Sequence, residues 1–333
     1  MLKLSEIIGN GVAIRILRSA LTQNKPASAY LFAGPPGVGK RTTAYAFAMA
    51  LLCEKGGDDA CGVCGQCRKV MVGSHPDLTY VEPIVRDRKV KQEIDIESIR
   101  EIIRKLSFRP YEGKRKILII DQVEKMNLVA SNAFLKTLEE PPGDTVIILT
   151  TENMSSLLLT ILSRLQKVRF MPLKFEEILR FATERAGLHG EQAEAYAALS
   201  KGAPGMMSEN AIEKEKETRS FALALLGERD AKWDADIMKM ADKIDRSKEK
   251  ALVYKVLESF VELLADLVKV KTKGKCDSLM NKDIVDELFS ISPRFSRRKL
   301  LRAWDVSSEL VRTRRWNINP FLIISLLALE LKR

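Results

Sequence analysis

The sequence predicts an α/β domain built on a parallel sheet, followed by two helical parts. Short apolar runs alternate with helical patterns up to about residue 170, a glycine-rich turn follows the first run, and strand-like runs stop after Phe170. Apolar strands that alternate with helices are typical of a parallel sheet covered on both faces. The chain has 333 residues, 46% of them hydrophobic, which is enough for two or three domains.

Five apolar runs are expected to form the strands of this sheet: residues 30–33, 78–82, 117–121, 146–150 and 167–170. The clearest helix between them is 94–106, where isoleucine and leucine recur along one broad stripe.

After Pro172 the pattern is helical, with a break at 201–207, and the segments 251–270 and 320–332 read as amphipathic or buried helices. We therefore predict three domains: 1–170, a small helical domain at 171–208, and a helical domain at 209–333.

The glycine-rich turn has the pattern of a phosphate-binding loop (P-loop). Residues 34–40 read G-P-P-G-V-G-K, which is G-x-x-x-x-G-K, and they connect a predicted strand to a predicted helix. In such a loop the backbone N–H groups cradle phosphates and the lysine reaches their outer oxygens. The candidate nucleotide-binding residues are Gly34, Pro35, Pro36, Gly37, Val38, Gly39, Lys40, Arg41 and Thr42.

The residue after the loop lysine departs from the pattern of a hydrolysing site. A serine or threonine hydroxyl ordinarily holds Mg²⁺ at this position, and here the residue is Arg41. Thr42 is one residue further on and offers partial compensation. The loop is thus suited to hold a nucleotide but is poorly equipped to hydrolyse it.

Asp121 follows four apolar residues and is expected at the carboxyl edge of the sheet, where ligands bind. An aspartate there commonly supports Mg²⁺ in P-loop proteins. The next residue of a hydrolysing site would be a glutamate that polarises water, whereas here it is Gln122. Losing a positioned general base typically costs about 10²–10⁴ in rate. Some nucleotidases orient water with a glutamine, so Gln122 weakens the case for hydrolysis without closing it.

Four of the five cysteines form the cluster C-x7-C-x2-C-x2-C, at Cys53, Cys61, Cys64 and Cys67. Four thiolates close a tetrahedral Zn²⁺ site, which leaves no open position and is therefore structural. The alternative, free buried thiols, rarely clusters in this way. His75 is expected to be a loop residue rather than a ligand, since four cysteines already suffice.

The net charge of +11 points to an acidic partner such as nucleic acid. The basic segments 294–302 and 312–315 are candidates for that contact, although a solvated helical face is the better explanation of them. No apolar run of 18 residues is present, and the first residues lack the apolar core of a signal peptide. We therefore expect a cytoplasmic protein without a membrane segment.

Several of these stretches together resemble the bacterial clamp-loader subunits of the AAA+ class. The matching text comprises IIGN, AYLFAGPPGVGK, CGVCGQCRKVMVGSHPDLTYVEP, SFRPYEGKRKILIID, SNAFLKTLEEPP, TILSR and NINPFLIISLLALEL. The resemblance covers nearly the whole chain. It implies an AAA+ domain at 1–170 with a zinc module at 53–67, a helical lid at 171–208, and a helical collar for oligomerisation at 209–333.

In this family five subunits form a ring of gamma/tau-type motors, one delta subunit and one stator, and the ring loads a sliding clamp onto primed DNA. The resemblance implies that Arg164, which spacing alone would make an ordinary solvated residue, is an arginine finger for the ATP of a neighbour. It also places Gly205 where motors carry a nucleotide-sensing arginine.

With Arg41 and Gln122, this gives three departures from the motor pattern, and they imply a stator with weak ATPase activity or none. An active gamma/tau-type motor is the alternative, distinguished by ATP turnover in a reconstituted ring. A small-molecule kinase lacks any recognisable substrate motif.

Overall fold

The computed structural model describes residues 3–85, 92–227, 250–273, 279–312, 322–323 and 326–327. The chain forms two compact units. The first comprises Met1–Phe181 with Gly202–Met206, and the second comprises Ala182–Lys201 with Met207–Arg333. Residues 313–315, which end the second basic segment, and most of the predicted helix 320–332 lie outside the described residues.

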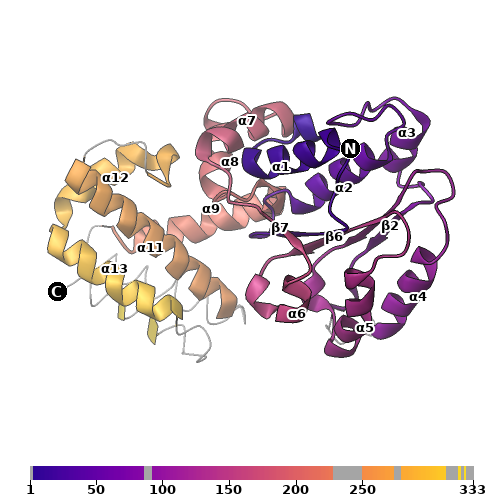
Figure 1. Ribbon diagram of the computed structural model, residues 1–333. Coiled ribbons are helices and arrows are strands. Elements are labelled where there is room, and N and C mark those ends of the chain that lie inside the picture. Colours follow the sequence, from indigo (N-terminus) through magenta and orange to yellow (C-terminus); the bar gives the residue numbers. More distant parts are fainter. Residues whose placement is uncertain are drawn as a thin grey trace. The chain divides into compact units, whose positions relative to one another are not determined.

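The first unit is an α/β domain (Figure 1). Its elements are η1 (Leu4–Glu6), α1 (Gly11–Thr22), β1 (Ala29–Ala33), α2 (Lys40–Leu52), α3 (Gly65–Met71), β2 (Leu78–Val81), β3 (Ile84–Val85), β4 (Gln92–Glu93), α4 (Ile96–Leu106), β5 (Lys116–Ile120), η2 (Val123–Lys125), α5 (Leu128–Glu139), β6 (Thr145–Thr151), η3 (Met154–Ser156), α6 (Leu159–Leu162), β7 (Gln166–Arg169), η4 (Pro204–Met206) and the start of α7 (Phe175–Arg185).

The predicted parallel sheet is confirmed. Its strand order is β2-β5-β6-β1-β7, and every neighbouring pair is parallel. All five predicted strands are present, with each end within one residue of its expected position. The short antiparallel pair β3–β4 was not expected.

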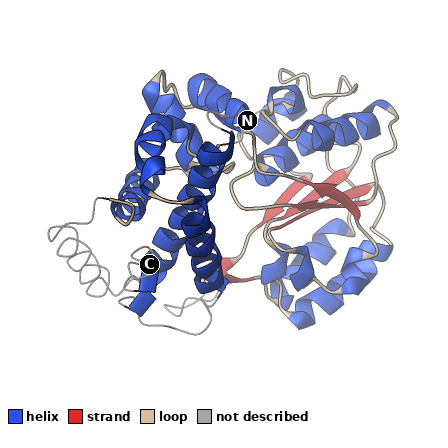
Figure 2. Ribbon diagram, turned by 90° about the vertical axis from the view of Figure 1, so that its left-hand side faces the viewer, coloured by secondary structure: helices blue, strands red, loops and turns tan. Residues whose placement is uncertain are grey.

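Helices cover both faces of this sheet, with α1, α2 and α3 on one side and α4, α5 and α6 on the other (Figures 1 and 2). Every residue of β1, β5 and β6 is buried, as expected for strands between two helical layers. Side-chain caps fix where two of the covering helices begin. Asp95 accepts from the N–H of Ser98 at 2.8 Å to start α4, and Asn127 caps α5 in the same way.

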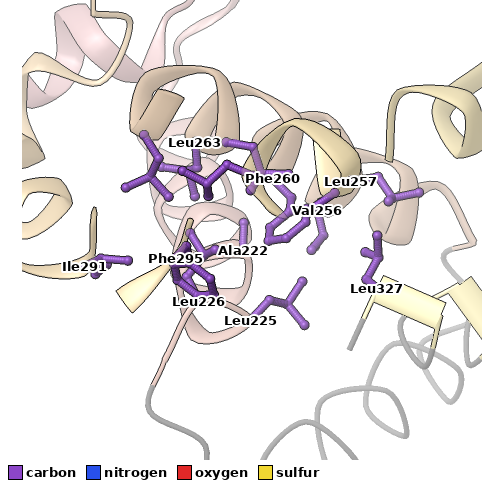
Figure 3. Close-up of a cluster of buried hydrophobic side chains, with 14 of the residues drawn as sticks. Ala222, Leu225, Leu226, Val256, Leu257, Phe260, Leu263, Ile291, Phe295 and Leu327 are labelled. Atoms are coloured by element: carbon purple, nitrogen blue, oxygen red, sulfur yellow. The ribbon is translucent and has the colours of Figure 1, made fainter. Parts of the chain in front are cut away.

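The described elements of the second unit are all helical: α8 (Glu191–Leu199), α9 (Glu209–Ala224), α11 (Lys250–Lys273), η5 (Lys282–Ile284), α12 (Val285–Ile291), η6 (Ser292–Arg294) and α13 (Arg297–Arg312). The apolar faces of α9, α11, α12 and α13 form one core, in which Phe260 and Leu263 of α11 lie among side chains such as Leu226 and Phe295 (Figure 3). The helical C-terminal part is thus confirmed. Its predicted division into lid and collar stays a prediction.

Buried polar groups fix the helices of the second unit to one another. Asp266 of α11 is fully buried, and its carboxylate accepts from the N–H groups of Met280 and Asn281 at 3.0 and 2.9 Å. The guanidinium of Arg219 in α9 donates two bonds to Asp283, at 2.9 and 2.6 Å. None of the helices in the described part of the chain has the length and apolar character that a bilayer crossing requires.

Candidate functional site

The phosphate loop lies at the carboxyl edge of the sheet, between β1 and α2. Gly37 and Gly39 have φ of +73° and +96°, a region that favours glycine, and Gly39 is the N-cap of α2. Gly34 is held against β7 so closely that a Cβ there would lie 2.2 Å from the carbonyl oxygen of Phe170. The glycines therefore build a loop whose following helix points its N–H groups toward it.

The lysine of the loop is buried and folded back onto its own loop. Lys40 is 7% exposed, and its Nζ donates to the carbonyl oxygens of Gly34 and Pro35 at 2.7 and 2.6 Å. Burial lowers its pKa, and the nearby carboxylates, with Glu152 foremost, act against that shift. Of the other predicted loop residues, Val38 is buried, whereas Pro35, Pro36, Arg41 and Thr42 are exposed.

The segment that ends the first unit packs on this loop. The N–H of Gly205 donates to the carbonyl of Gly37 at 3.0 Å. A Cβ at Gly205 would lie 2.9 Å from that same oxygen. The position at which the resemblance expects a sensing arginine therefore has no room even for a methyl group.

Asp121 lies at the carboxyl end of β5, as predicted, but both of its oxygens already accept hydrogen bonds. The Tyr80 hydroxyl lies 3.2 Å from Oδ2 and 3.3 Å from Oε2 of Glu82, so these two carboxylates share its one proton, and the Thr150 hydroxyl donates to Oδ1. Burial and the charge of Asp121 raise the pKa of Tyr80, so the phenol keeps the proton that it donates. The carboxylate is thus held by hydroxyl groups of the two neighbouring strands.

Arg41 is stacked on Tyr80, the residue whose hydroxyl lies next to this carboxylate. Its guanidinium carbon is 4.6 Å from the centre of the Tyr80 ring, and Nη1 is 3.5 Å from Oε2 of Glu82. Tyr45 of α2 adds a second ring, with its centre 5.3 Å from that of Tyr80. Arginine stacks well on aromatic faces, which keeps its charge at this edge of the sheet.

Arg41 changes the usual P-loop site for a magnesium ion. Mg²⁺ requires oxygen ligands in near-octahedral geometry. Arg41 has no acceptor atom, whereas Asp121 keeps lone pairs free on both oxygens beside the bonds that it accepts. Gln122 has φ +51° and donates its N–H to the Thr150 hydroxyl at 3.1 Å. The cradle for phosphates is present, whereas a guanidinium replaces the hydroxyl ligand that ordinarily follows the loop lysine.

The four cysteines come together at the end of α2 and the start of α3. Their Sγ atoms all lie within 4.8 Å of one another, and those of Cys61 and Cys67 are 3.9 Å apart. In a tetrahedral site with Zn–S bonds of 2.3 Å, sulfur atoms are about 3.8 Å apart. The cluster therefore has the geometry of a four-thiolate metal site.

Backbone N–H groups point at these sulfur atoms. Cys61 Sγ accepts from the N–H groups of Val63 and Cys64, which lower the pKa of its thiol to about 6. Cys64 Sγ caps α3 by accepting from the N–H of Cys67 at 3.4 Å. Such bonds favour the thiolate form that binds metal. His75 lies in the loop after α3, as predicted.

Arg164 follows the short helix α6, immediately before β7. Its Nε donates to Oε1 of Glu139 at 2.7 Å, and Nη2 contacts the same oxygen. Its Nη1 donates to the Thr160 carbonyl at 2.5 Å and to the Ser163 hydroxyl at 3.1 Å. The Arg164 side chain is 32% exposed and that of Glu139 is 46% exposed, so this ion pair lies on the surface.

Sequence reasoning did not single out Tyr80, Thr150 and Glu139. The first two form hydrogen bonds with Asp121, and Glu139 forms them with Arg164. The sequence gives little indication of these contacts, because each contact depends on which helices and strands become neighbours in the fold. Tyr80 reaches Asp121 only because β2 and β5 pair, with Tyr80 opposite Ile119.

Comparison with known proteins places the chain among DNA polymerase III subunits. The sequence profile of the family described as "DNA polymerase III, delta subunit" matches residues 9–174. Subunit tau of DNA polymerase III from Bacillus subtilis is 27% identical over 341 residues, which cover 96% of this chain and 59% of the relative. Subunit delta' from Pseudomonas aeruginosa is 36% identical over 180 residues, 54% of each chain.

A solved structure of a gamma subunit-related protein of DNA polymerase III from Thermotoga maritima aligns over 97% of this chain and 99% of that one, with 20% identity and a TM-score of 0.37. The chain spans only 54–59% of the length of the two relatives above. The profile match includes the phosphate loop, the cysteines, Asp121 and Arg164. The chain belongs to the clamp-loader family of bacterial DNA polymerase III subunits.

Proposed function

We propose that the chain is the delta-prime subunit of the clamp loader, a stator that completes the ATPase site of a neighbour. The observation that carries this proposal is an asymmetry between two sites. The chain's own nucleotide site lacks the metal-binding hydroxyl at Arg41 and the water-polarising glutamate at Gln122. Arg164, by contrast, is held by a surface carboxylate that a competing anion can displace.

In this role Arg164 acts in trans on ATP bound by a gamma/tau-type motor subunit. Its guanidinium stabilises the charge of the transferring phosphoryl group, which is worth about 10³–10⁵ in rate where an arginine finger acts. For this the side chain leaves Glu139 and reaches across the subunit boundary. Its backbone lies on a short connection between α6 and β7, and these two elements fix the position from which the side chain extends.

The proposed assembly is a hetero-pentamer of gamma/tau motor subunits, a delta subunit and this chain, located in the cytoplasm. It loads the sliding clamp onto primed DNA, and this chain contributes through the complex. Its nucleotide loop, residues 34–42 with Asp121, would bind ATP weakly and hydrolyse little of it.

We also propose that the cysteine cluster holds one structural Zn²⁺. Four Sγ atoms at tetrahedral spacing support this, and metal binding by such small modules is worth about 10 kcal/mol or more. The ion would tie the end of α2 to the start of α3. Elemental analysis of protein prepared without added metal or chelator is expected to find one zinc per chain, and a reproducible absence rules the site out.

An active gamma/tau-type motor is the second candidate function. The match of 96% of this chain to a tau subunit favours it. A motor would hydrolyse ATP at its own loop, which the absence of a hydroxyl at Arg41 and of a general base at Gln122 opposes.

ATP turnover by the purified chain distinguishes the two functions. The stator is expected to show background turnover alone and to raise the turnover of added gamma/tau and delta subunits in the presence of clamp and primed DNA. A motor would hydrolyse ATP alone or lose ring activity when its own loop is disabled. Steady turnover by the isolated chain, abolished by Lys40→Ala, would contradict the stator.

A further inference from the structure

The phosphate loop of this chain departs from the usual P-loop pattern in only some of its residues. The glycines that shape the anion cradle are all present, and so is the buried Lys40. The departure within the loop is Arg41, at the position whose hydroxyl ordinarily holds Mg²⁺. A guanidinium there offers hydrogen-bond donors to an anion, where a hydroxyl would offer an acceptor to a metal.

Arg41 supplies such a cation, and its surroundings hold it there. The guanidinium stacks on Tyr80 at 4.6 Å, and Tyr80 in turn donates to Asp121. Its ion pair with Glu82 is long, at 3.5 Å, and both side chains are more than half exposed. Such a pair is weak, so the guanidinium can exchange Glu82 for phosphate oxygens without leaving the tyrosine.

A metal ion at the same point meets two changes at Arg41. The side chain adds a positive charge there, and it replaces the hydroxyl that would otherwise be a metal ligand. Guanidinium groups bind phosphate by paired N–H bonds and need no metal to do so.

We propose that this phosphate loop binds the phosphate chain of a nucleotide without Mg²⁺, with the Arg41 guanidinium in the place of the metal. The proposal goes beyond the stator role and does not depend on it. Under it, free ATP is the ligand and Mg²⁺ competes with the loop for free ATP, because the magnesium complex of ATP is not the species that the loop accepts.

Calorimetric titration of the full chain with ATP tests this, in metal-free buffer and in millimolar Mg²⁺. Chelators are left out because they would also extract metal from the cysteine cluster. We expect Mg²⁺ to weaken the apparent affinity for ATP at least tenfold. Arg41→Thr, which restores a hydroxyl, is expected to lose affinity in metal-free buffer at least tenfold and no longer to be weakened by Mg²⁺.

Two further variants make the test specific. Arg41→Lys keeps the charge and is expected to bind more weakly while Mg²⁺ still opposes binding. Arg100→Thr removes an exposed arginine of α4, on the other face of the sheet, and is expected to behave as the unmodified chain does. Thermal unfolding checks that each variant is folded.

Tighter binding in Mg²⁺, equal binding in both buffers, or no binding in either would overturn the proposal. None of these outcomes bears on Arg164, whose role is read from ring turnover. Failure here and failure of the stator function are therefore separate results.

Discussion

The phosphate-loop edge and the surroundings of Arg164 lie in the same α/β unit, yet they hold their charged groups in different ways. At the loop, Lys40 is buried against two carbonyl oxygens and Asp121 accepts from the hydroxyls of two adjacent strands. Arg164 instead pairs with one carboxylate on the surface. Buried contacts hold the charged groups of the first region. In the second region an exposed ion pair holds Arg164, and breaking such a pair costs little free energy.

This difference shows that a chain can have the glycine pattern of a phosphate loop without all of the groups that hydrolysis requires. The glycines at 37 and 39 are needed to turn the chain from β1 into α2, so selection for folding alone would keep them. The residue after the loop lysine is exposed, so a hydroxyl there is not needed for folding. Arg164 makes local bonds to Glu139, Thr160 and Ser163 and still keeps part of its side chain at the surface, where a partner can reach it.

The largest expected effect is on ATP turnover, and it tests the contrast between the two regions directly. Arg164→Ala in a reconstituted ring is expected to lower ATP turnover about 10³-fold or more at the one interface that it serves, because the transition-state charge there loses its cation. Lys40→Ala is expected to leave most of the ring's turnover in place. Clamp- and DNA-stimulated ATPase of rings containing each variant measures both.

Lys167→Ala is the matched control, since it removes an exposed cation three residues away on β7. It is expected to leave turnover unchanged. If Lys40→Ala stops the ring while Arg164→Ala has no effect, the two regions have the opposite roles and the chain is a motor.

Much of the fold followed from hydrophobic pattern alone. The five strands are continuous apolar runs because both faces of the sheet are covered. This pattern can be recognised without knowing which strands are neighbours in the sheet. The antiparallel pair β3–β4 was missed because two-residue strands carry no period.

The site was harder to predict than the fold. The positions of Lys40, Asp121 and Arg164 on their elements were predicted, because each follows a strand or a helix in sequence. What these groups touch was not, since the hydroxyls of Tyr80 and Thr150 reach Asp121 across the sheet. The close contact of Gly205 with Gly37 likewise joins residues far apart in sequence.

That contact gives the second prediction. Gly205→Ala is expected to destabilise the chain by about 1–3 kcal/mol, because a Cβ there lies 2.9 Å from a backbone oxygen that must move. Gly11→Ala is the control. Its position is an exposed helix start with only the Arg15 side chain nearby, at 3.9 Å, and alanine there is expected to be neutral or slightly stabilising.

Urea unfolding of both variants measures the difference. Equal stabilities would mean that the 202–206 segment does not press on the loop. A motor-type arginine at Gly205 would then be sterically allowed, and one of the three departures from the motor pattern would lose its structural basis.

The smallest expected effect concerns the carboxylate that restrains Arg164. An exposed ion pair is worth about 0–1 kcal/mol, so Glu139→Gln is expected to make the guanidinium available to a neighbour no more than about fivefold more readily. The gain would be seen as a lower concentration of motor subunits needed for half-maximal ring turnover, and added salt would shrink it because salt already screens the pair. A loss of turnover like that of Arg164→Ala would show instead that Glu139 positions the arginine for the neighbour's phosphate. In that case the surface contact is part of the active arrangement, and the contrast between a closed loop and a readily freed arginine no longer holds.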